Sequence, residues 1–98
     1  MAGRTRYLLA YDIREPRRLR RVHSIAKDFG EPLQYSVFVC DLTPMELFDL
    51  KAELLDRMNL SEDSVAIFDL GAPAARTIKC VEFMGVQRPL PDEFPRVW

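Results

Sequence analysis

The fold is decided by one stretch, TRYLLAYDIREPRRLRRVHSIAKDFG, which covers residues 5–30. Its first part, Thr5–Ile13, is a nearly continuous apolar run, typical of a strand buried on both faces. Pro16 then breaks the run and suits the first turn of a helix. Residues 17–29 carry apolar side chains at helical spacing: Leu19, Val22, Ile25, Ala26 and Phe29. Gly30 is a natural C-cap residue, so the stretch predicts a strand and then a helix with a defined end.

The remaining sequence predicts further strands and a second helix. Residues 31–42 are rich in strand-forming side chains and form either one strand or a short edge piece bent into a longer one near Gln34. Residues 43–46, Thr-Pro-Met-Glu, read as a capping box, so the second helix begins there. Ser64–Leu70 has the composition of a strand, and Ile78–Met84 is a weaker candidate.

The predicted second helix has an apolar stripe and an acidic face. The stripe consists of Leu47, Leu50, Leu54, Leu55 and Met58. The acidic face consists of Glu46, Asp49, Glu53 and Asp56. This face serves solubility or receives a basic partner protein, and the sequence leaves both readings open.

This order of elements predicts a two-layer α+β sandwich, in which two helices cover one face of an antiparallel sheet. A ferredoxin-like βαββαβ arrangement over residues 1–85 is its simplest version. The uncovered face must then meet solvent, RNA or a second copy of the chain. Residues 86–98 combine prolines with apolar side chains and end in Trp98, so we expect a C-terminal dimerisation segment that lies on another subunit.

The net charge of −1 hides a strong asymmetry along the chain. Residues 1–30 carry eight Lys or Arg against three Asp or Glu, whereas residues 31–70 carry two against nine. A local cluster of cations can bind a polyanion whatever the total charge. No apolar run reaches the length of a membrane span and no signal-peptide pattern precedes the first strand, so we expect a cytoplasmic protein without a membrane partner.

Asp12 closes the first apolar run and is followed by an arginine cluster. The cluster consists of Arg14, Arg17, Arg18, Arg20 and Arg21. A carboxylate is a hard oxygen ligand suited to Mg²⁺ or Mn²⁺, and guanidinium groups bind phosphate oxygens. The pair therefore indicates phosphate chemistry. Asp12 could equally pair with a nearby arginine, and the arginines could form a solvated helix face.

Four short motifs follow one another along the chain. They are Tyr11-Asp12-Ile13 before the arginine-rich helix, the Phe29-Gly30 helix end, Gln-Tyr-Ser-Val-Phe at 34–38 and Asp-Ser-Val-Ala-Ile-Phe at 63–68. Together they resemble the CRISPR-associated protein 2 family, the small subunits of the machinery that inserts new spacers into CRISPR arrays. The combination is far more specific than any one motif.

The resemblance implies a ferredoxin-like homodimer in which the C-terminal segment adds an extra strand to the partner's sheet. It also implies that Asp12 lies close to its symmetry mate and that the two carboxylates hold one divalent ion, Mg²⁺ or Mn²⁺. Some members are described as metal-dependent endonucleases on single-stranded RNA or double-stranded DNA. Others are described as non-catalytic scaffolds between integrase dimers.

We therefore expect a homodimeric, metal-dependent endonuclease acting in CRISPR adaptation and antiviral defence, with Asp12 as catalytic residue and metal ligand. Low activity is expected, because one carboxylate per chain cannot build a two-metal site. One alternative is a non-catalytic DNA-binding scaffold that docks an integrase subunit. Another is an RNA-binding ferredoxin-like module.

Secondary candidates lie near Asp12 in the sequence or on the predicted strands. Arg17 or Arg18 could stabilise transition-state charge, and the Ser36 hydroxyl could orient a phosphate or a water. Tyr11, Tyr35 and Phe38 could stack on bases, although aromatic residues on strands are more often core. His23 borders the apolar stripe, and we expect a partly buried structural residue.

Overall fold

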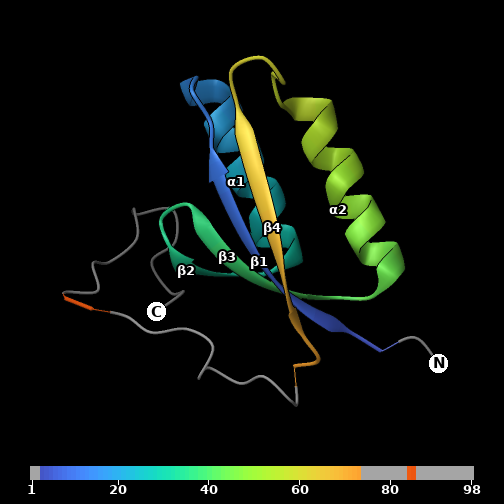
Figure 1. The fold of residues 1–98 in the computed structure, drawn as a ribbon. Coiled ribbons are helices and arrows are strands. Elements are labelled where there is room, and N and C mark those ends of the chain that lie inside the picture. Colours follow the sequence, from blue (N-terminus) through green and yellow to red (C-terminus); the bar gives the residue numbers. More distant parts are fainter. Residues whose placement is uncertain (1–2, 74–83, 86–98) are drawn as a thin grey trace.

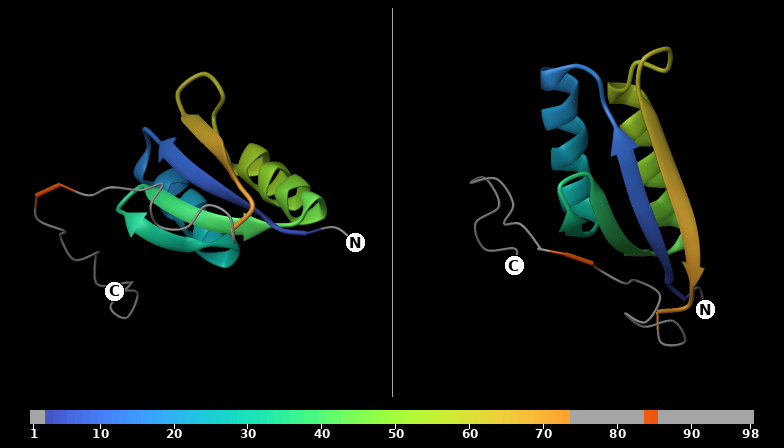
Figure 2. Two further views of the ribbon diagram at one scale, coloured as in Figure 1. Left: turned by 60° about the horizontal axis from the view of Figure 1, so that its bottom comes forward. Right: turned by 60° about the vertical axis from the view of Figure 1, so that its left-hand side comes forward.

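The structure is a computed structural model that describes residues 3–73 and 84–85. Its elements are β1 (Thr5–Asp12), α1 (Pro16–Phe29), β2 (Glu31–Gln34), β3 (Val37–Leu42), α2 (Pro44–Arg57) and β4 (Ser64–Gly71). The strands form one antiparallel sheet in the order β2-β3-β1-β4, and both helices cover the same face (Figure 1). This is the predicted ferredoxin-like α+β sandwich, and Figure 2 shows the two layers from other sides.

The sequence between the two helices forms a hairpin. The chain turns at Tyr35 and Ser36, so that β2 and β3 run antiparallel, with a register shift between Pro32 and Gln34. The alternative of one continuous strand is therefore wrong. The expected bend near Gln34 is present, but it is a full reversal that places β2 at the edge of the sheet.

The core lies between the sheet and the helices. From β1, Leu9 and Tyr11 point inward and meet Phe38 and Cys40 of β3, while Val22 projects from α1. The alternate residues Arg6, Leu8 and Ala10 of β1 are only half-buried and Asp12 is exposed, because no helix covers the other face. The expectation of a strand buried on both faces is thus not met within one chain.

Each helix begins at a side-chain cap. Glu15 accepts a hydrogen bond from the Arg18 amide at 2.8 Å, and Pro16 occupies the first helical position of α1. Thr43 and Glu46 exchange the reciprocal bonds of the predicted capping box at the start of α2. In α2, Leu50 and Leu54 are buried as predicted, but Leu55 is exposed. One member of the predicted buried stripe is therefore wrong.

Gly30 ends α1 at the predicted position, but for a different physical reason. Its φ of −164° is extended backbone and not the left-handed conformation that makes glycine a common C-cap. A Cβ at this position would collide with the Val39 carbonyl oxygen and the Cys40 sulfur of β3. Glycine is required here because a strand passes directly against the helix end.

Two predicted segments fall outside the described residues: the weak strand at 78–84, apart from its last residue, and the dimerisation segment at 86–98. Neither helix in the described part of the chain is long and apolar enough to cross a bilayer.

Replacing Gly30 with alanine is expected to lower the free energy of unfolding by about 1–3 kcal/mol, because the added methyl group must displace β3 backbone. Urea unfolding measures this. Gly3→Ala is the matched control, since a Cβ at Gly3 meets nothing within 4 Å. Equal stability of the two variants would contradict the close approach.

Candidate functional site at the end of strand β1

Asp12 is the last residue of β1, and its side chain is 68% exposed on the uncovered face of the sheet. It lies opposite Ser64, the first residue of β4, in the strand register. The neighbouring Tyr11 amide donates to the Ser36 carbonyl at 3.2 Å. Strand pairing therefore brings Asp12, Ser36 and Ser64 to one end of the sheet. The sequence did not single out Ser64, because its position depends on the pairing of β1 with β4.

The uncovered face is apolar at its centre. It carries pairs of apolar residues from three strands: Leu8 and Ala10, Val37 and Val39, and Ala66 and Phe68. In the register, Leu8 lies between Val39 and Phe68, and the Phe68 residue is 51% exposed. Asp12 therefore borders an apolar surface that the helices of its own chain do not cover.

Arg18 does not belong to a free cationic surface. Its Nε and Nη2 donate to the two carboxylate oxygens of Asp63 at 2.8 and 3.2 Å, and Nη2 also bonds Glu62 at 2.9 Å. The structure therefore does not favour the predicted phosphate-binding role of Arg18. Its guanidinium neutralises an acidic loop, and Nε and Nη2 are taken up by Asp63 and Glu62.

Asp63 is the centre of this network. From the sequence it was identified only as part of a family motif, and this structural role was not predicted. Its side chain is fully buried and also accepts the amides of Arg14 and Asn59, both at 2.9 Å. The Arg18 guanidinium, followed by these two amides, holds the pKa of Asp63 well below its ordinary value of 3.8, against the opposing effect of desolvation. The turn after β1 and the loop before β4 are thus fastened together beside Asp12.

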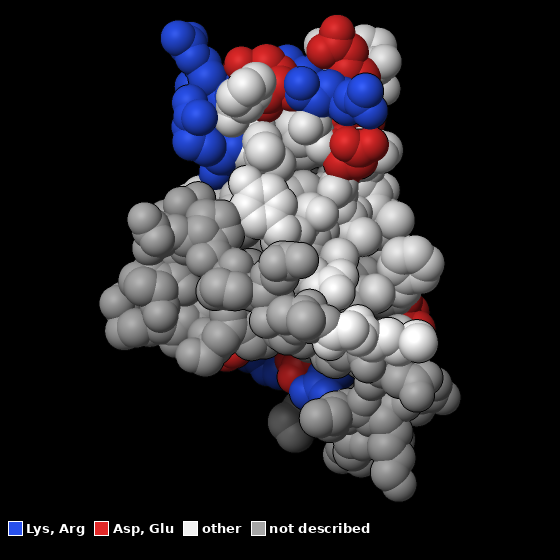
Figure 3. Space-filling model, turned by 90° about the vertical axis from the view of Figure 1, so that its left-hand side faces the viewer, with Lys and Arg blue, Asp and Glu red and all other residues white. Residues whose placement is uncertain are grey.

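The other predicted arginines remain at the surface. Arg14 makes only a long contact of 3.4 Å with Asp12, and both side chains are mostly exposed. Arg17, Arg20 and Arg21 are exposed on α1 and form no ion pair with another described residue. Basic and acidic side chains gather at the same end of the molecule, where α1 begins (Figure 3). These three arginines therefore keep their predicted availability for phosphate.

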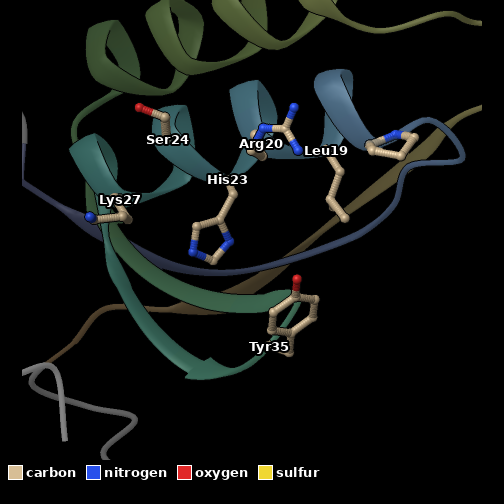
Figure 4. Close-up of a pocket in the computed structure, with 7 residues that line it drawn as sticks. Leu19, Arg20, His23, Ser24, Lys27 and Tyr35 are labelled. Carbon is tan, nitrogen blue, oxygen red and sulfur yellow. The ribbon is translucent and has the colours of Figure 1, made fainter. Parts of the chain in front are cut away.

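A hollow of about 630 Å³ lies between α1 and the β2–β3 turn. Its lining includes Leu19, Arg20, His23, Ser24 and Tyr35, and the Tyr35 and His23 rings face one another across it (Figure 4). Tyr35 is 51% exposed. An exposed aromatic ring therefore lies near one of the surface arginines.

Tyr11 and Phe38 are corrected to core residues. Phe38 is fully buried, and the buried Tyr11 hydroxyl lies 2.5 Å from His23 Nδ1. Burial, and secondarily the nearby Tyr35, raises the pKa of Tyr11. Both rings point to the helices, so neither can stack on a base. His23 is buried, in line with the structural role expected for it.

Three comparisons with known proteins bear on this arrangement. The sequence pattern of the family described as CRISPR associated protein Cas2 matches residues 5–78. The chain belongs to the Cas2 family. It is 45% identical over 64 residues to a CRISPR-associated endoribonuclease Cas2 of Thermodesulfovibrio yellowstonii, covering 65% of this chain and 70% of that one. It is 32% identical over 90 residues to a CRISPR-associated endonuclease Cas2 of Thermus thermophilus, covering 92% and 91%.

The fold agrees with solved Cas2 structures. The crystal structure of Streptococcus pyogenes Cas2 at pH 6.5 matches with a TM-score of 0.73 and 32% identity, covering 82% of this chain and 99% of that chain. The resemblance inferred from the four motifs is confirmed. All four motifs lie within the matched residues 5–78.

Replacing Asp63 with asparagine is expected to reduce the melting temperature above pH 5 by about 5 °C or more and to flatten its dependence on acid. Because the folded-state pKa of Asp63 lies below 3.8, its stabilisation is present above that value and is lost as the pH falls through and below it. Melting curves between pH 2 and 7, taken as differences from the wild type, isolate this contribution.

Glu62→Gln is the matched control, because Glu62 contacts the same Arg18 but its carboxylate is 57% exposed. This variant should keep the acid dependence of the wild type. A wild-type pH profile in Asp63→Asn would show that the buried carboxylate does not stabilise the loop.

Proposed function

We propose that the chain is a CRISPR adaptation protein that acts as a homodimeric, metal-dependent endonuclease on RNA or DNA phosphodiesters, in spacer acquisition and antiviral defence. The names of its relatives, an endoribonuclease and an endonuclease, support hydrolysis of phosphodiesters. The single observation that carries the proposal is an exposed carboxylate, Asp12, at the border of an uncovered apolar sheet face.

The apolar face supports a homodimer. Leu8, Val39 and Phe68 form a row across three strands that a second copy of the same face would bury. A two-fold axis through this face makes the surface self-complementary and relates Asp12 of the two chains. The segment 86–98 is proposed to extend the contact by adding a strand to the partner's sheet.

The donors at the end of β1 fit a hard divalent ion. No group of three His, Cys, Asp or Glu lies together in the described residues, so the described part of one chain does not supply a full set of such ligands, and Asp12 is the carboxylate proposed to hold the ion. Mg²⁺ often keeps several waters and binds through one or two carboxylates. Asp12 from each chain, with the nearby Ser36 and Ser64 oxygens, therefore suits one shared Mg²⁺ or Mn²⁺ at modest affinity.

In this proposal the chain's own residues bind and orient the substrate. Asp12 supplies fixed negative charge where the ion and its waters assemble, while Arg14 and Arg17 neutralise the phosphate on either side. The ion, when bound, polarises the scissile phosphate and makes a bound water more acidic. Ser36 and Ser64 contribute hydroxyl groups that orient a phosphate oxygen or a water.

Nucleic acid is proposed to follow α1. Arg17, Arg20 and Arg21 contact phosphates, and Tyr35 offers a stacking surface for an unpaired base near Arg20. On the uncovered face, the central strands β1 and β3 present Leu8, Ala10, Val37 and Val39 and no aromatic side chain. This argues against an RNA-recognition module of the RRM type, which stacks bases on aromatic residues there.

A second function is a non-catalytic DNA-binding scaffold that docks a CRISPR integrase subunit. It is favoured by the single carboxylate per chain, because a site with few ligands gives low activity. The arginines of α1 would serve this function unchanged, so cleavage and binding must be measured separately.

Replacing Asp12 with asparagine is expected to reduce cleavage of single-stranded RNA or double-stranded DNA by at least about 100-fold, because the amide cannot replace the charge that holds the ion. Labelled oligonucleotides are incubated with Mg²⁺, Mn²⁺ or a chelator, and cleavage and binding are followed in parallel. Asp28→Asn, an exposed carboxylate on α1, is the control and should cleave as the wild type does.

Phe68→Asp tests the shared site without touching Asp12. It should give a folded monomer by sedimentation and circular dichroism, and cleavage should be lost with the dimer. Wild-type cleavage by Asp12→Asn would exclude Asp12 as the catalytic residue, and cleavage by a Phe68→Asp monomer would exclude a site built from two chains. Binding without any cleavage by the wild type would favour the scaffold.

Arg20→Gln and Arg21→Gln should each weaken nucleic-acid binding and reduce the slope of log K against log salt by about 1, because each removes one phosphate contact. Fluorescence anisotropy over a range of salt concentrations measures both quantities. Arg57→Gln on α2 is the control and should leave the slope unchanged. An unchanged slope in both α1 variants would show that α1 does not face the phosphates.

A further inference from the structure

Helix α2 carries a second apolar stripe that plays no part in the core. Met45 and Phe48 are each 68% exposed and Leu55 is 58% exposed, with the small Ala52 exposed between them. The spacings of three, four and three residues place these four side chains on one side of the helix. The core of the chain is contacted by a different side, which carries Leu50 and Leu54.

An apolar groove continues this stripe toward the sheet. It has a volume of about 400 Å³ and lies between α2 and the edge strand β4. The apolar side chains that line it are Leu54, Leu55, Met58, Leu60, Val65 and Ile67. Leu60, in the loop after α2, is itself 70% exposed. Exposed apolar side chains on successive turns and in the next loop form a continuous surface, of the kind that marks a protein contact.

The charges beside the stripe are predominantly negative. At about 100° per residue, Asp49, Glu53 and Asp56 fall along one border of the stripe, and Lys51 falls on the other, next to the groove. Asp49 and Glu53 are exposed and form no ion pair with another described residue. An acidic border repels nucleic acid and anionic lipid, which leaves a protein as the complementary occupant.

We propose that α2 is a docking surface for an amphipathic helix of another protein, with apolar side chains on one face and Lys or Arg along one border. The apolar face would cover Phe48, Leu55 and the groove, and the basic border would meet Asp49 and Glu53. α2 has 14 residues and is about 21 Å long, enough for three turns of side chains to interdigitate with a second helix.

A second copy of the chain fits this surface less well. Pairing α2 with itself would bring Asp49 and Glu53 of each copy, which form no ion pair with another described residue, into one interface with only one lysine each, and like charges oppose association. The surface also lies in the helix layer, away from the uncovered sheet face that carries Asp12. Partner docking and the proposed dimer can therefore coexist.

The experiment measures binding of the full chain to two synthetic helical peptides of about 18 residues by fluorescence anisotropy. Both peptides carry the same leucine stripe, and one has lysines along its border where the other has glutamates. The lysine peptide should bind at least about tenfold more tightly, and this preference should shrink as salt rises. Chemical shifts of the labelled chain should change along α2 and at Leu60.

Variants separate the apolar from the charged contribution. The double variant Phe48→Gln with Leu55→Gln should bind the lysine peptide at least about tenfold more weakly than the wild type does. The double variant Asp49→Asn with Glu53→Gln should lose most of the preference for the lysine peptide over the glutamate peptide. Met84→Gln is the control, because it also replaces an exposed apolar residue with glutamine but lies outside α2. Met84 is 92% exposed. It should bind as the wild type does.

Any of four results would overturn the proposal. The two peptides could bind equally, or neither could bind. The shift changes could lie away from α2. Sedimentation could show that Phe48→Gln with Leu55→Gln changes the oligomeric state, which would make the stripe a contact between copies of this chain.

Discussion

The arrangement of the site depends on the buried ion pair between Asp63 and Arg18. The fully buried carboxylate of Asp63 accepts two hydrogen bonds from the Arg18 guanidinium and one from each of the backbone amides of Arg14 and Asn59. A buried carboxylate needs such complete satisfaction, because an unpaired charge there is costly. The pair thereby joins two segments distant in sequence: the one that runs from the turn after β1 into the first turn of α1, and the loop before β4. Asp12, paired with Ser64 at the end of β1, lies next to these segments, so a carboxylate that takes no part in the proposed chemistry stabilises the backbone on either side of the site.

The second constraint is that two helices cover only one face of the sheet. The covered face buries Leu9, Phe38 and Cys40, whereas the opposite face leaves Leu8, Val39 and Phe68 partly or largely in water. A chain of 98 residues has few apolar side chains to leave unburied. The apolar run that reads as a strand buried on both faces is consistent with this, since a partner would complete the second layer. The proposed shared metal site follows from the same geometry, because Asp12 borders that layer.

The local elements could be predicted from the sequence because their signals are local. The helix starts depend on contacts within a few residues, such as those of Pro16 and the Thr43 capping box. The structure confirms both helix starts and the apolar stripe of α1. The family resemblance was likewise carried by short motifs. The face of a strand on which a residue lies depends on register, yet Tyr11 and Phe38 could have been assigned to the core from their alternation with Asp12 and Val37.

The candidate site was harder to predict because it depends on long-range contacts. Arg18 cannot be told from Arg17 or Arg21 in the sequence. What distinguishes it is a hydrogen bond to Asp63, a residue 45 positions away along the chain. Ser64 joins Asp12 through strand pairing, which no local pattern encodes. Gly30 was correctly predicted to end a helix. The reason that glycine is needed there, the close approach of Val39 and Cys40 of β3, could not be predicted from the sequence. Leu55 was assigned to the core stripe, but its spacing from Phe48 and Ala52 places it on a different side of α2 from the buried Leu50 and Leu54.

The charge asymmetry of the sequence becomes a division between the two helices. α1 presents arginines and α2 presents carboxylates beside apolar side chains, although both cover the same face of one sheet. A polyanion attracted to α1 would be repelled by α2, so the proposed nucleic-acid contact is confined to the α1 side of the molecule. In this proposal the apolar stripe of α2 stays clear of nucleic acid and accessible to the proposed basic partner. The near-zero net charge therefore reflects two surfaces of opposite sign, each complementary to a different class of proposed partner.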